Sequence, residues 1–196
     1  NELNKKSLDK VENLLKVNCN IVGLDRMYQV KVDRSVGGER ISTEKPSDIT
    51  QIKYFEVNEQ EKSIIFKNGT WDVDEDLIIP KDYSVFATSG LRINLINHAM
   101  IKSYSPMYLS GKSDDPIIIT SDDSTGQGLF ILNNSVTSSL VNVYFSNLAS
   151  PSKKGWGLTG AITFYDADVA ITNCHFIDNM GGDDYLNVDR SEFTIQ

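Results

Sequence analysis

The side chains best suited to binding a ligand lie in two short stretches, residues 160–166 and 184–190. Alternation along a strand sends every second side chain to the outer face. The expected ligand-facing residues are Thr163, Tyr165, Asp166, Asn187, Asp189 and Arg190. Aromatic rings cover the apolar C–H surface of sugars, and charged groups bond strongly to hydroxyls, so this set predicts a sugar-binding surface. The alternative is that these residues only form the polar exterior of a soluble β protein.

Trp156 is a further aromatic candidate, because it lies in a polar, turn-rich insert at residues 149–157 (ASPSKKGWG). Its ring would either overhang the outer face and stack on a sugar, or hold the insert against the protein. We include Trp156 among the predicted polysaccharide-binding residues.

Three carboxylates, Asp183, Asp184 and Asp189, are the candidates for catalysis. A pair of carboxylates can supply acid and base for cleavage of a glycosidic bond. Asp183 and Asp184 also follow Gly181 and Gly182, which is ordinary turn composition. Whether the chain is an enzyme is therefore left open.

No metal or cofactor site is predicted from the motifs. Asp72, Asp74 and Asp76 resemble the start of a calcium loop, but Leu77 stands where the loop requires glycine. His98 and His175 each stand alone, without a nucleophile or a second histidine at useful spacing. The aspartates are therefore predicted to form turns, and His175 to lie on the surface.

The candidate residues belong to a repeated pattern. Residues 128–134, 160–166 and 184–190 align with starts 32 and then 24 residues apart. This alignment places three apolar pairs in register, facing inward: Phe130/Leu132, Ile162/Phe164 and Leu186/Val188.

A second alignment joins residues 140–145 (LVNVYF) to residues 171–176 (ITNCHF). It stacks Asn142 on Asn173 at a turn and places Cys174 beside Val143 as a small buried residue. The apolar residues Leu140, Ile171 and Ile195 fall in a further column.

Short strands that repeat every 20 to 25 residues, without helices between them, are typical of a parallel β-solenoid. Earlier intervals fit the same period: Tyr83 to Pro106 is 23 residues and Pro106 to Gly128 is 22. We predict an all-β fold, a right-handed parallel β-helix of about five coils starting near residue 64.

The first part of the chain does not show this repeat. Residues 1–18 have helical spacing, with Ser7 as N-cap and an apolar stripe of Leu8, Val11, Leu14 and Leu15. A strand is expected from Met27, a loop over residues 34–48, and a hairpin formed by residues 52–57 and 63–66. The predicted domains are an N-terminal helix-and-strand segment at residues 1–62, which caps the first coil, and the β-helix at residues 63–196.

The composition of the chain disfavours some classes of partner. The chain has 196 residues and a formal net charge of -8, which disfavours nucleic acid as a partner. No run of 18 apolar residues is present, so no membrane span is predicted. The chain begins at Asn1 without a signal segment, as a cleaved precursor or an excised piece would.

The last repeat is expected to leave apolar residues facing a core with no coil below them. These are Leu186, Val188, Phe193 and Ile195. This predicts either the N-terminal piece of a longer solenoid or end-to-end self-association.

The segments LIIPKDYSVFATSGLRINL, GAITFYDADVAITNCHFIDN and DDYLNVDRSEFTI resemble the right-handed parallel β-helix proteins of the pectate-lyase-like superfamily, and more narrowly large bacterial β-helix repeat proteins. The resemblance covers about residues 63–196. It implies a carbohydrate-related role, since the superfamily includes polysaccharide lyases, polygalacturonases, epimerases and adhesive modules. The chain lacks the Asp-Pro-His-Glu run of alginate epimerases and the Gly-His-Gly and Arg-Ile-Lys motifs of polygalacturonases.

The sequence thus predicts an extracellular or cell-surface module that recognises a polysaccharide on its outer face. One alternative is a polysaccharide lyase or glycoside hydrolase completed by coils beyond residue 196. The other is a structural stalk or adhesin unit.

Overall fold

The computed structural model describes residues 17–20, 27–30, 46–153 and 156–196. The chain forms two compact units, residues 1–43 and residues 44–196. Among the described residues, no helix is long and apolar enough to cross a bilayer.

The first unit contains one antiparallel strand pair. Strand β1 (Val17–Asn20) pairs with β2 (Met27–Val30), and Val17 lies opposite Val30. The strand expected from Met27 is therefore confirmed. The predicted helix extended to residue 18, which was wrong at its end because Val17 begins β1. The rest of that predicted helix, at residues 1–16, lies outside the described residues.

The second unit begins with a hairpin, as predicted. A short 3-10 helix η1 (Ile49–Gln51) precedes β3 (Phe55–Asn58), which pairs antiparallel with β4 (Ser63–Phe66). Phe55 and Phe66 lie opposite each other in the hairpin, and their ring centroids are 4.6 Å apart. The ring centroid of Tyr54 lies 5.2 Å from that of Phe55. Asn58 closes the turn, since its carboxamide oxygen accepts the backbone N–H groups of Gln60 and Glu61.

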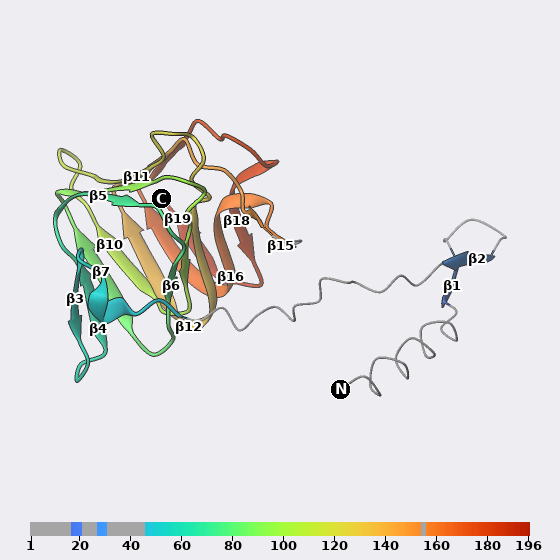
Figure 1. Cartoon of the computed structure of the whole chain (residues 1–196), viewed down its shortest axis with the longest axis horizontal. Coiled ribbons are helices and arrows are strands. Elements are labelled where there is room, and N and C mark those ends of the chain that lie inside the picture. The colour runs from blue at the N-terminus through green and yellow to red at the C-terminus, as the bar shows by residue number, and fades with distance from the viewer. Residues whose placement is uncertain (1–16, 21–26, 31–45, 154–155) are drawn as a thin grey trace, which may run out of the picture. The chain divides into compact units, whose positions relative to one another are not determined.

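After β4 all main strands of the second unit pair in parallel (Figure 1). They form three groups, which we call sheets A, B and C. Sheet A contains β6 (Leu77–Ile79), β9 (Ile101–Ser103), the first halves of β12 (Leu129–Val141) and β16 (Gly160–Thr172), and β18 (Asp184–Asp189). Sheet B contains β4, β7 (Ser84–Thr88), β10 (Met107–Ser110), the second halves of β12 and β16, and β19 (Phe193–Ile195).

Sheet C contains β5 (Gly69–Val73), β8 (Leu91–Leu95), β11 (Ile117–Thr120), β13 (Val143–Ser146) and β17 (His175–Ile177). Along the chain the strands fall in the order B, C, A, and this order repeats. The described part is thus all-β with parallel sheets, and is compatible with a β-helix-like fold.

The core lies between the three sheets and is built from columns of like residues. In sheet B, Ala87, Leu109, Leu140 and Ile171 follow one another in register, and all four are buried. In sheet C, the rings of Phe145 and Phe176 stack at 5.2 Å with an interplanar angle of 11°. Stacking buries the inner face that a single coil would leave exposed.

The turn between sheets B and C confirms the stacked asparagines. Asn142 and Asn173 have φ values of 49° and 51°, a left-handed conformation that asparagine tolerates well. The Asn142 N–H donates to Thr172 O at 3.0 Å, and its carboxamide donates to Gly111 O at 3.0 Å. The second alignment is thus correct, since Leu140 pairs with Ile171 and Phe145 with Phe176.

The first alignment was displaced by one residue between β12 and β16. Leu129, not Phe130, lies beside Ile162, and Phe130 lies beside Thr163. Phe130 is therefore on the outer side of sheet A, yet it is fully buried. The prediction failed because it assumed that a large apolar residue must face the core.

The insert between β13 and β16 contains a second antiparallel hairpin and is tied to the start of sheet A. Strands β14 (Ser152–Lys153) and β15 (Trp156–Gly157) form an antiparallel hairpin. The Lys153 ammonium pairs with the carboxylate of Asp76, which directly precedes β6 at the far side of sheet A. The connection between β13 and β16 thus reaches back toward the first strand of sheet A.

Candidate functional site

The predicted residues Tyr165 and Asp189 meet at the end of sheet A. They lie side by side in the pairing of β16 with β18, and Leu132 lies beside Tyr165 on β12. Tyr104 follows directly after Ser103, which pairs with Ile131, so it continues this column by register. Adjacent members of such a column are about 4.8 Å apart.

The next position along the chain forms the turn from sheet A to sheet B. Asn133, Asp166 and Arg190 occupy it in successive strands, with φ values of 50°, 50° and 53°. All three side chains are exposed. The shared left-handed conformation turns the chain and projects an amide, a carboxylate and a guanidinium along one edge, which we call the A/B edge.

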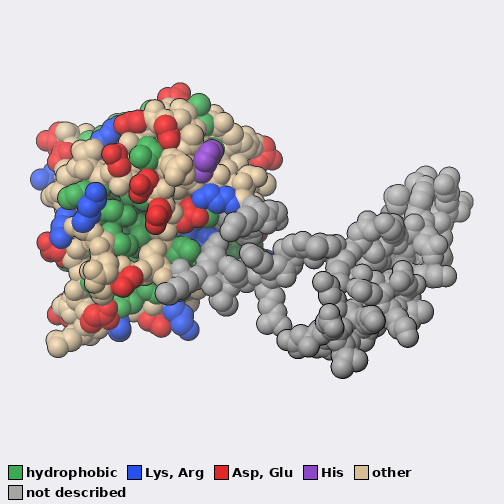
Figure 2. Space-filling view, viewed as in Figure 1, with side chains coloured by type: hydrophobic (Ala, Val, Ile, Leu, Met, Phe, Trp, Pro, Cys, Tyr) green, Lys and Arg blue, Asp and Glu red, His purple; other side chains and the backbone are tan. Residues whose placement is uncertain are grey.

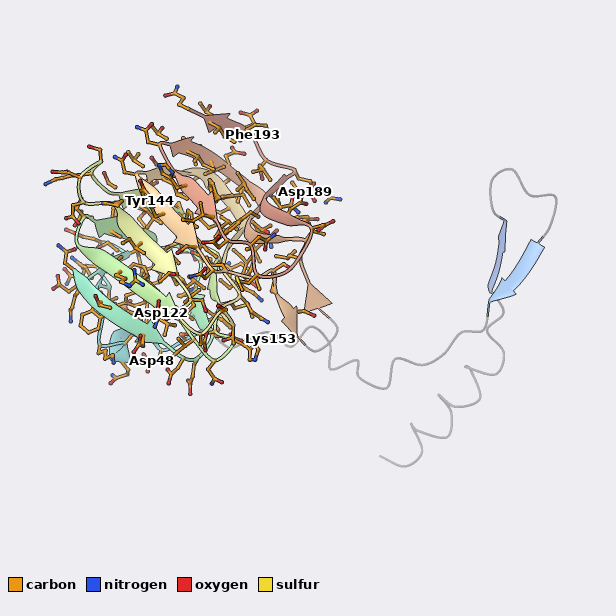
Figure 3. The ribbon with its side chains drawn as sticks, turned by 90° about the horizontal axis from the view of Figure 1, so that it is seen from above. Asp48, Asp122, Tyr144, Lys153, Asp189 and Phe193 are labelled. Carbon is orange, nitrogen blue, oxygen red and sulfur yellow. The ribbon has the colours of Figure 1, made fainter. Side chains whose placement is uncertain are left out.

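Arg190 and Tyr165 form a cation–π pair at this edge. The guanidinium carbon lies 5.5 Å from the centroid of the Tyr165 ring. The contact covers one face of the half-buried ring, while the planar guanidinium keeps donors for an incoming hydroxyl or carboxylate. Asp189, the partner of Tyr165 in the strand pairing, lies well away from Tyr144 in Figure 3.

A cavity of about 430 Å³ opens beside the earlier strands of the A/B edge. Its lining includes two lysines, two tyrosines and two asparagines, namely Lys62, Lys81, Tyr83, Tyr104, Asn133 and Asn134. Tyr104 is in the same column of sheet A as Tyr165, and Asn133 is in the same turn position as Asp166. Because Tyr104 and Asn133 also line the cavity, the cavity and the predicted residues lie along one edge. Its size is in the range of small-ligand sites.

Tyr83 is held in place by two charged neighbours. Its hydroxyl donates to Glu59 at 2.8 Å, and the Lys62 ammonium lies 3.1 Å from the same oxygen and 4.9 Å from the Tyr83 ring. The hydrogen bond from Tyr83, then that from Lys62, lowers the pKa of Glu59, and the bond to Glu59 raises the pKa of Tyr83. The group fixes the ring at the mouth of the cavity.

One side of the cavity is formed by an extra loop on β12. Three residues lie between Asn134 and Ser138, whereas only one lies between their partners on β16, Ala167 and Val169. The Asn134 carboxamide donates to Val136 O at 2.9 Å and accepts the Val136 N–H at 3.2 Å. This closed turn leaves Ser135 and Val136 beside the cavity.

The interior of sheet A offers less than the sequence predicted. Thr163 is 1 % exposed, and its hydroxyl donates to Gly160 O at 3.1 Å. Asn187 is half-buried, and its carboxamide donates to Thr159 at 2.6 Å. The fully exposed members of the predicted set, Asp166, Asp189 and Arg190, therefore lie at the edge end of sheet A.

The three candidate catalytic aspartates are not brought together. Asp184 begins β18 and Asp189 ends it, which separates them by about 16 Å at the rise of a strand. Glycosidase carboxylate pairs lie about 5–10 Å apart. Asp183 precedes Asp184 in the turn and is exposed, so neither forms such a pair with Asp189.

The remaining predicted residues are placed as follows. The Trp156 backbone pairs with Lys153 in the insert hairpin. His175 is exposed and stacks on Tyr144 at 4.2 Å, on the outer side of sheet C. Cys174 packs against the core, and burial raises the pKa of its thiol. The part of the chain that the structure describes contains no group of three or more His, Cys, Asp or Glu arranged to hold a metal ion.

Sequence reasoning missed the cavity and its lysines. Tyr83 marked the repeat period, but the strands before it were not aligned with the later coils, so Lys62 and Lys81 were not connected to Tyr165. The space-filling view shows acidic side chains spread over one face, with basic groups between them (Figure 2). The charged residues that are close together in the sequence did not indicate the cavity.

Comparison with family models, with curated proteins and with solved structures gives no match to the chain.

Proposed function

We propose that the chain recognises a polysaccharide along the A/B edge, without cleaving it. The observation that carries this proposal is the continuity between the cavity at Tyr83 and Tyr104 and the exposed group at Tyr165, Asp189 and Arg190. Tyrosine rings suit the C–H faces of sugars, and the amides and charged groups suit hydroxyls. The cavity lining carries two lysines, Lys62 and Lys81, and two carboxylates, Glu61 and Asp82, so it offers both donors and acceptors to sugar hydroxyls.

We infer a right-handed parallel β-helix of about five coils over residues 63–196, related to the pectate-lyase-like superfamily. The repeated order of sheets B, C and A supports it. Location at the cell surface or outside the cell follows from the glycan partner and belongs to the same proposal.

The absence of catalysis is favoured by the separation of Asp184 from Asp189. The enzyme alternative requires a carboxylate partner from beyond residue 196, and the structural alternative requires no ligand at all. A screen against uronate and neutral polysaccharides, with and without calcium, separates the three when binding and cleavage are both scored.

The site is tested with a matched pair of tyrosine variants. Tyr165→Ala removes the ring at the A/B edge, whereas Tyr144→Ala removes an equally half-buried ring from sheet C. The expected loss of polysaccharide affinity is about tenfold for Tyr165→Ala, comparable to one ring contact, and less than twofold for Tyr144→Ala. Equal losses, or none in either variant, would remove the A/B edge from the proposal.

A further inference from the structure

The connections from sheet A to sheet B differ in length. Between residues that pair in both sheets, the successive connections are residues 80–85, 104–107, 132–138, 165–169 and 189–193. The second connection has four residues, whereas those on either side of it have six and seven, and the last two have five each. Residues of the first three connections line the cavity of about 430 Å³ at the A/B edge. The short connection therefore lies recessed between two longer ones, and this difference in length creates the cavity.

Hydrogen bonds fix the short connection, which forms the floor of the cavity. The Ser105 hydroxyl donates to Pro80 O at 2.6 Å and accepts the Tyr83 N–H at 3.0 Å. Ser105 is fully buried, and Pro106 O accepts the Val85 N–H at 3.0 Å. The floor is thus bonded to the preceding connection, and the cavity is built into the hydrogen-bonded backbone.

The turn of the β3–β4 hairpin forms the end wall of the cavity. Glu61 and Lys62 line the cavity from this turn. The Glu59 carboxylate accepts the Tyr83 hydroxyl at 2.8 Å, and Lys62 O accepts the Ser84 N–H at 2.8 Å, so the turn is tied to the next connection. Among the described residues, β6 is the first strand of sheet A. The A/B edge therefore ends beside this turn.

The extra loop on β12 forms the opposite wall, toward the later strands. Residues 135–136 of this loop line the cavity. The loop follows Asn133, on the sheet B side of the edge. On the sheet A side, the column of Tyr104, Leu132 and Tyr165 continues without an insertion. This column is the uninterrupted route between the cavity and the exposed group at Tyr165.

The space between the two walls suits one sugar unit. The two long connections are two strand spacings apart, or about 10 Å between backbones. A terminal sugar unit carries a hydroxyl that an interior unit lacks, because the interior oxygen is used in the next linkage. Charged groups bond strongly to such a hydroxyl. The lining supplies two aromatic rings and charged groups of both signs, namely Tyr83, Tyr104, Lys62, Lys81, Glu61 and Asp82.

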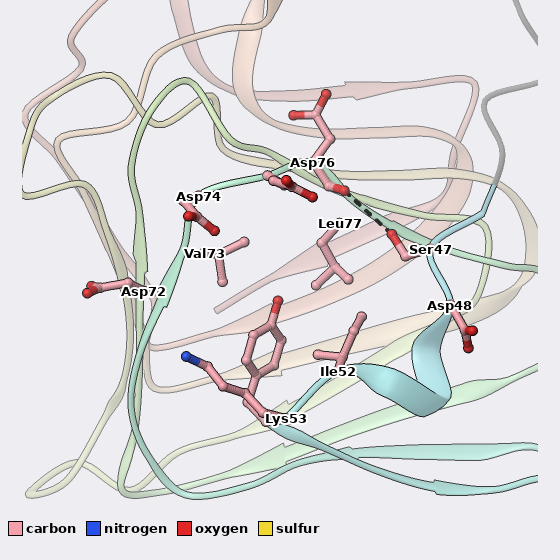
Figure 4. A pocket seen from close by; sticks show the side chains of 11 residues that line it. Ser47, Asp48, Ile52, Lys53, Asp72, Val73, Asp74, Asp76 and Leu77 are labelled. Carbon is pink, nitrogen blue, oxygen red and sulfur yellow. Dashed lines mark hydrogen bonds between the residues drawn. The ribbon is translucent and has the colours of Figure 1, made fainter.

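A second hollow, at the first strands of the large unit, is less suited to a sugar. It has a volume of about 340 Å³ and lies between residues 47–54 and residues 72–77. Its lining has one aromatic ring, that of Tyr54, and five carboxylates against one ammonium. Figure 4 shows the Ser47 hydroxyl directed to the backbone oxygen of Asp76, 3.5 Å away, so the two segments are also tied to each other.

On the basis of the proposed glycan recognition at the A/B edge, we propose that the cavity receives the terminal unit of the polysaccharide. The glycan lies along the column of Tyr165, Leu132 and Tyr104, and its last unit lies against Tyr83. The hairpin turn stands where a further unit would lie. The chain therefore recognises the ends of glycan chains and not their interiors.

The test compares intact and shortened polymers, with polygalacturonate and amylose as probes. Each probe is used before and after limited acid hydrolysis, at constant mass, to displace a labelled fragment of the same polymer from the full chain. Shortening the polymer about tenfold multiplies its ends about tenfold, so the mass concentration that gives half-displacement should fall about tenfold. An unchanged value would show binding to chain interiors and overturn this inference, while glycan recognition would stand. If neither probe bound in either form, glycan recognition itself would fail, and this inference with it.

The role of the extra loop is tested by shortening it. Deletion of Ser135 and Val136 gives the β12 connection the five residues of the β16 connection. The preference for shortened polymer should then drop from about tenfold to about twofold or less, because the glycan can leave the cavity toward sheet B.

The matched control is deletion of Ser113 and Asp114, which removes two residues from an exposed turn outside the cavity. This variant should keep the preference for shortened polymer. Loss of the preference in both deletion variants, or in neither, would overturn the assignment of the loop as a wall. If a deletion variant failed to fold, the comparison of intact and shortened polymer on the unaltered chain would still decide whether ends are recognised.

Discussion

At the scale of the residue, neighbouring strands lie so close together that one added side-chain atom can destabilise the fold. Gly128 has a φ of 80°, and a Cβ there would overlap the Ala161 carbonyl oxygen of the neighbouring strand. Gly128→Ala should lower the free energy of unfolding by more than about 2 kcal/mol, because both backbone strain and overlap must be relieved. Urea unfolding measures the loss. Gly181→Ala is the control, since its nearest neighbour would be 3.7 Å away and its φ is ordinary. Similar losses in both variants would contradict the packing described.

Tyr54 predicts how stability depends on pH. Its pKa is raised from 10.0 to about 12, so the folded state holds this proton more tightly than the unfolded state. The corresponding stability is present in full below pH 10 and is lost as the pH rises from 10 to about 12. Tyr54→Phe should therefore make the free energy of unfolding fall less steeply in that range. An unchanged slope in the variant would show that Tyr54 is not the group responsible.

At the scale of the element, the insert hairpin is fastened by one ion pair. Lys153→Met removes the ammonium that holds β14 to Asp76. Amide hydrogen exchange at Ser152, Lys153 and Gly157 should accelerate, while the global free energy of unfolding changes by about 1 kcal/mol or less, as is usual for a partly exposed pair. Lys112→Met, on an exposed turn, serves as control. Unchanged exchange in Lys153→Met would mean that backbone pairing alone holds the hairpin.

The elements also show what sequence can and cannot predict. Asn142 and Asn173 were found because a left-handed turn favours asparagine and leaves a chemical signature in each repeat. Phe130 was aligned wrongly because it is buried on the outer side of sheet A. The spacing of apolar residues along a strand indicates that they are buried, but not on which side of the sheet. The cavity at Tyr83 escaped notice because it combines residues from the hairpin with residues from the extra loop at Asn134, and no local pattern connects them.

At the scale of the whole molecule, one end of the described sheets exposes apolar side chains. Phe193 and Ile195 are 61 % and 54 % exposed, and Ile177 and Met180 are 47 % exposed each. Figure 3 places Phe193 at the margin of the molecule. End-to-end association of the 196-residue chain stays a prediction: Phe193→Lys with Ile195→Lys should shift a concentration-dependent oligomer to monomer in sedimentation experiments. A chain that is monomeric at all concentrations would contradict it.

The central claim, that a polysaccharide lies along the A/B edge, is tested most directly by hydrogen exchange with and without a polysaccharide that binds in the screen. Exchange should slow at residues 132–136, 164–167 and 188–191, where successive strands present Asn133, Asp166 and Arg190. Sheet C, including Tyr144 and His175, should exchange unchanged. Protection confined to sheet C, or spread evenly over the chain, would contradict the claim.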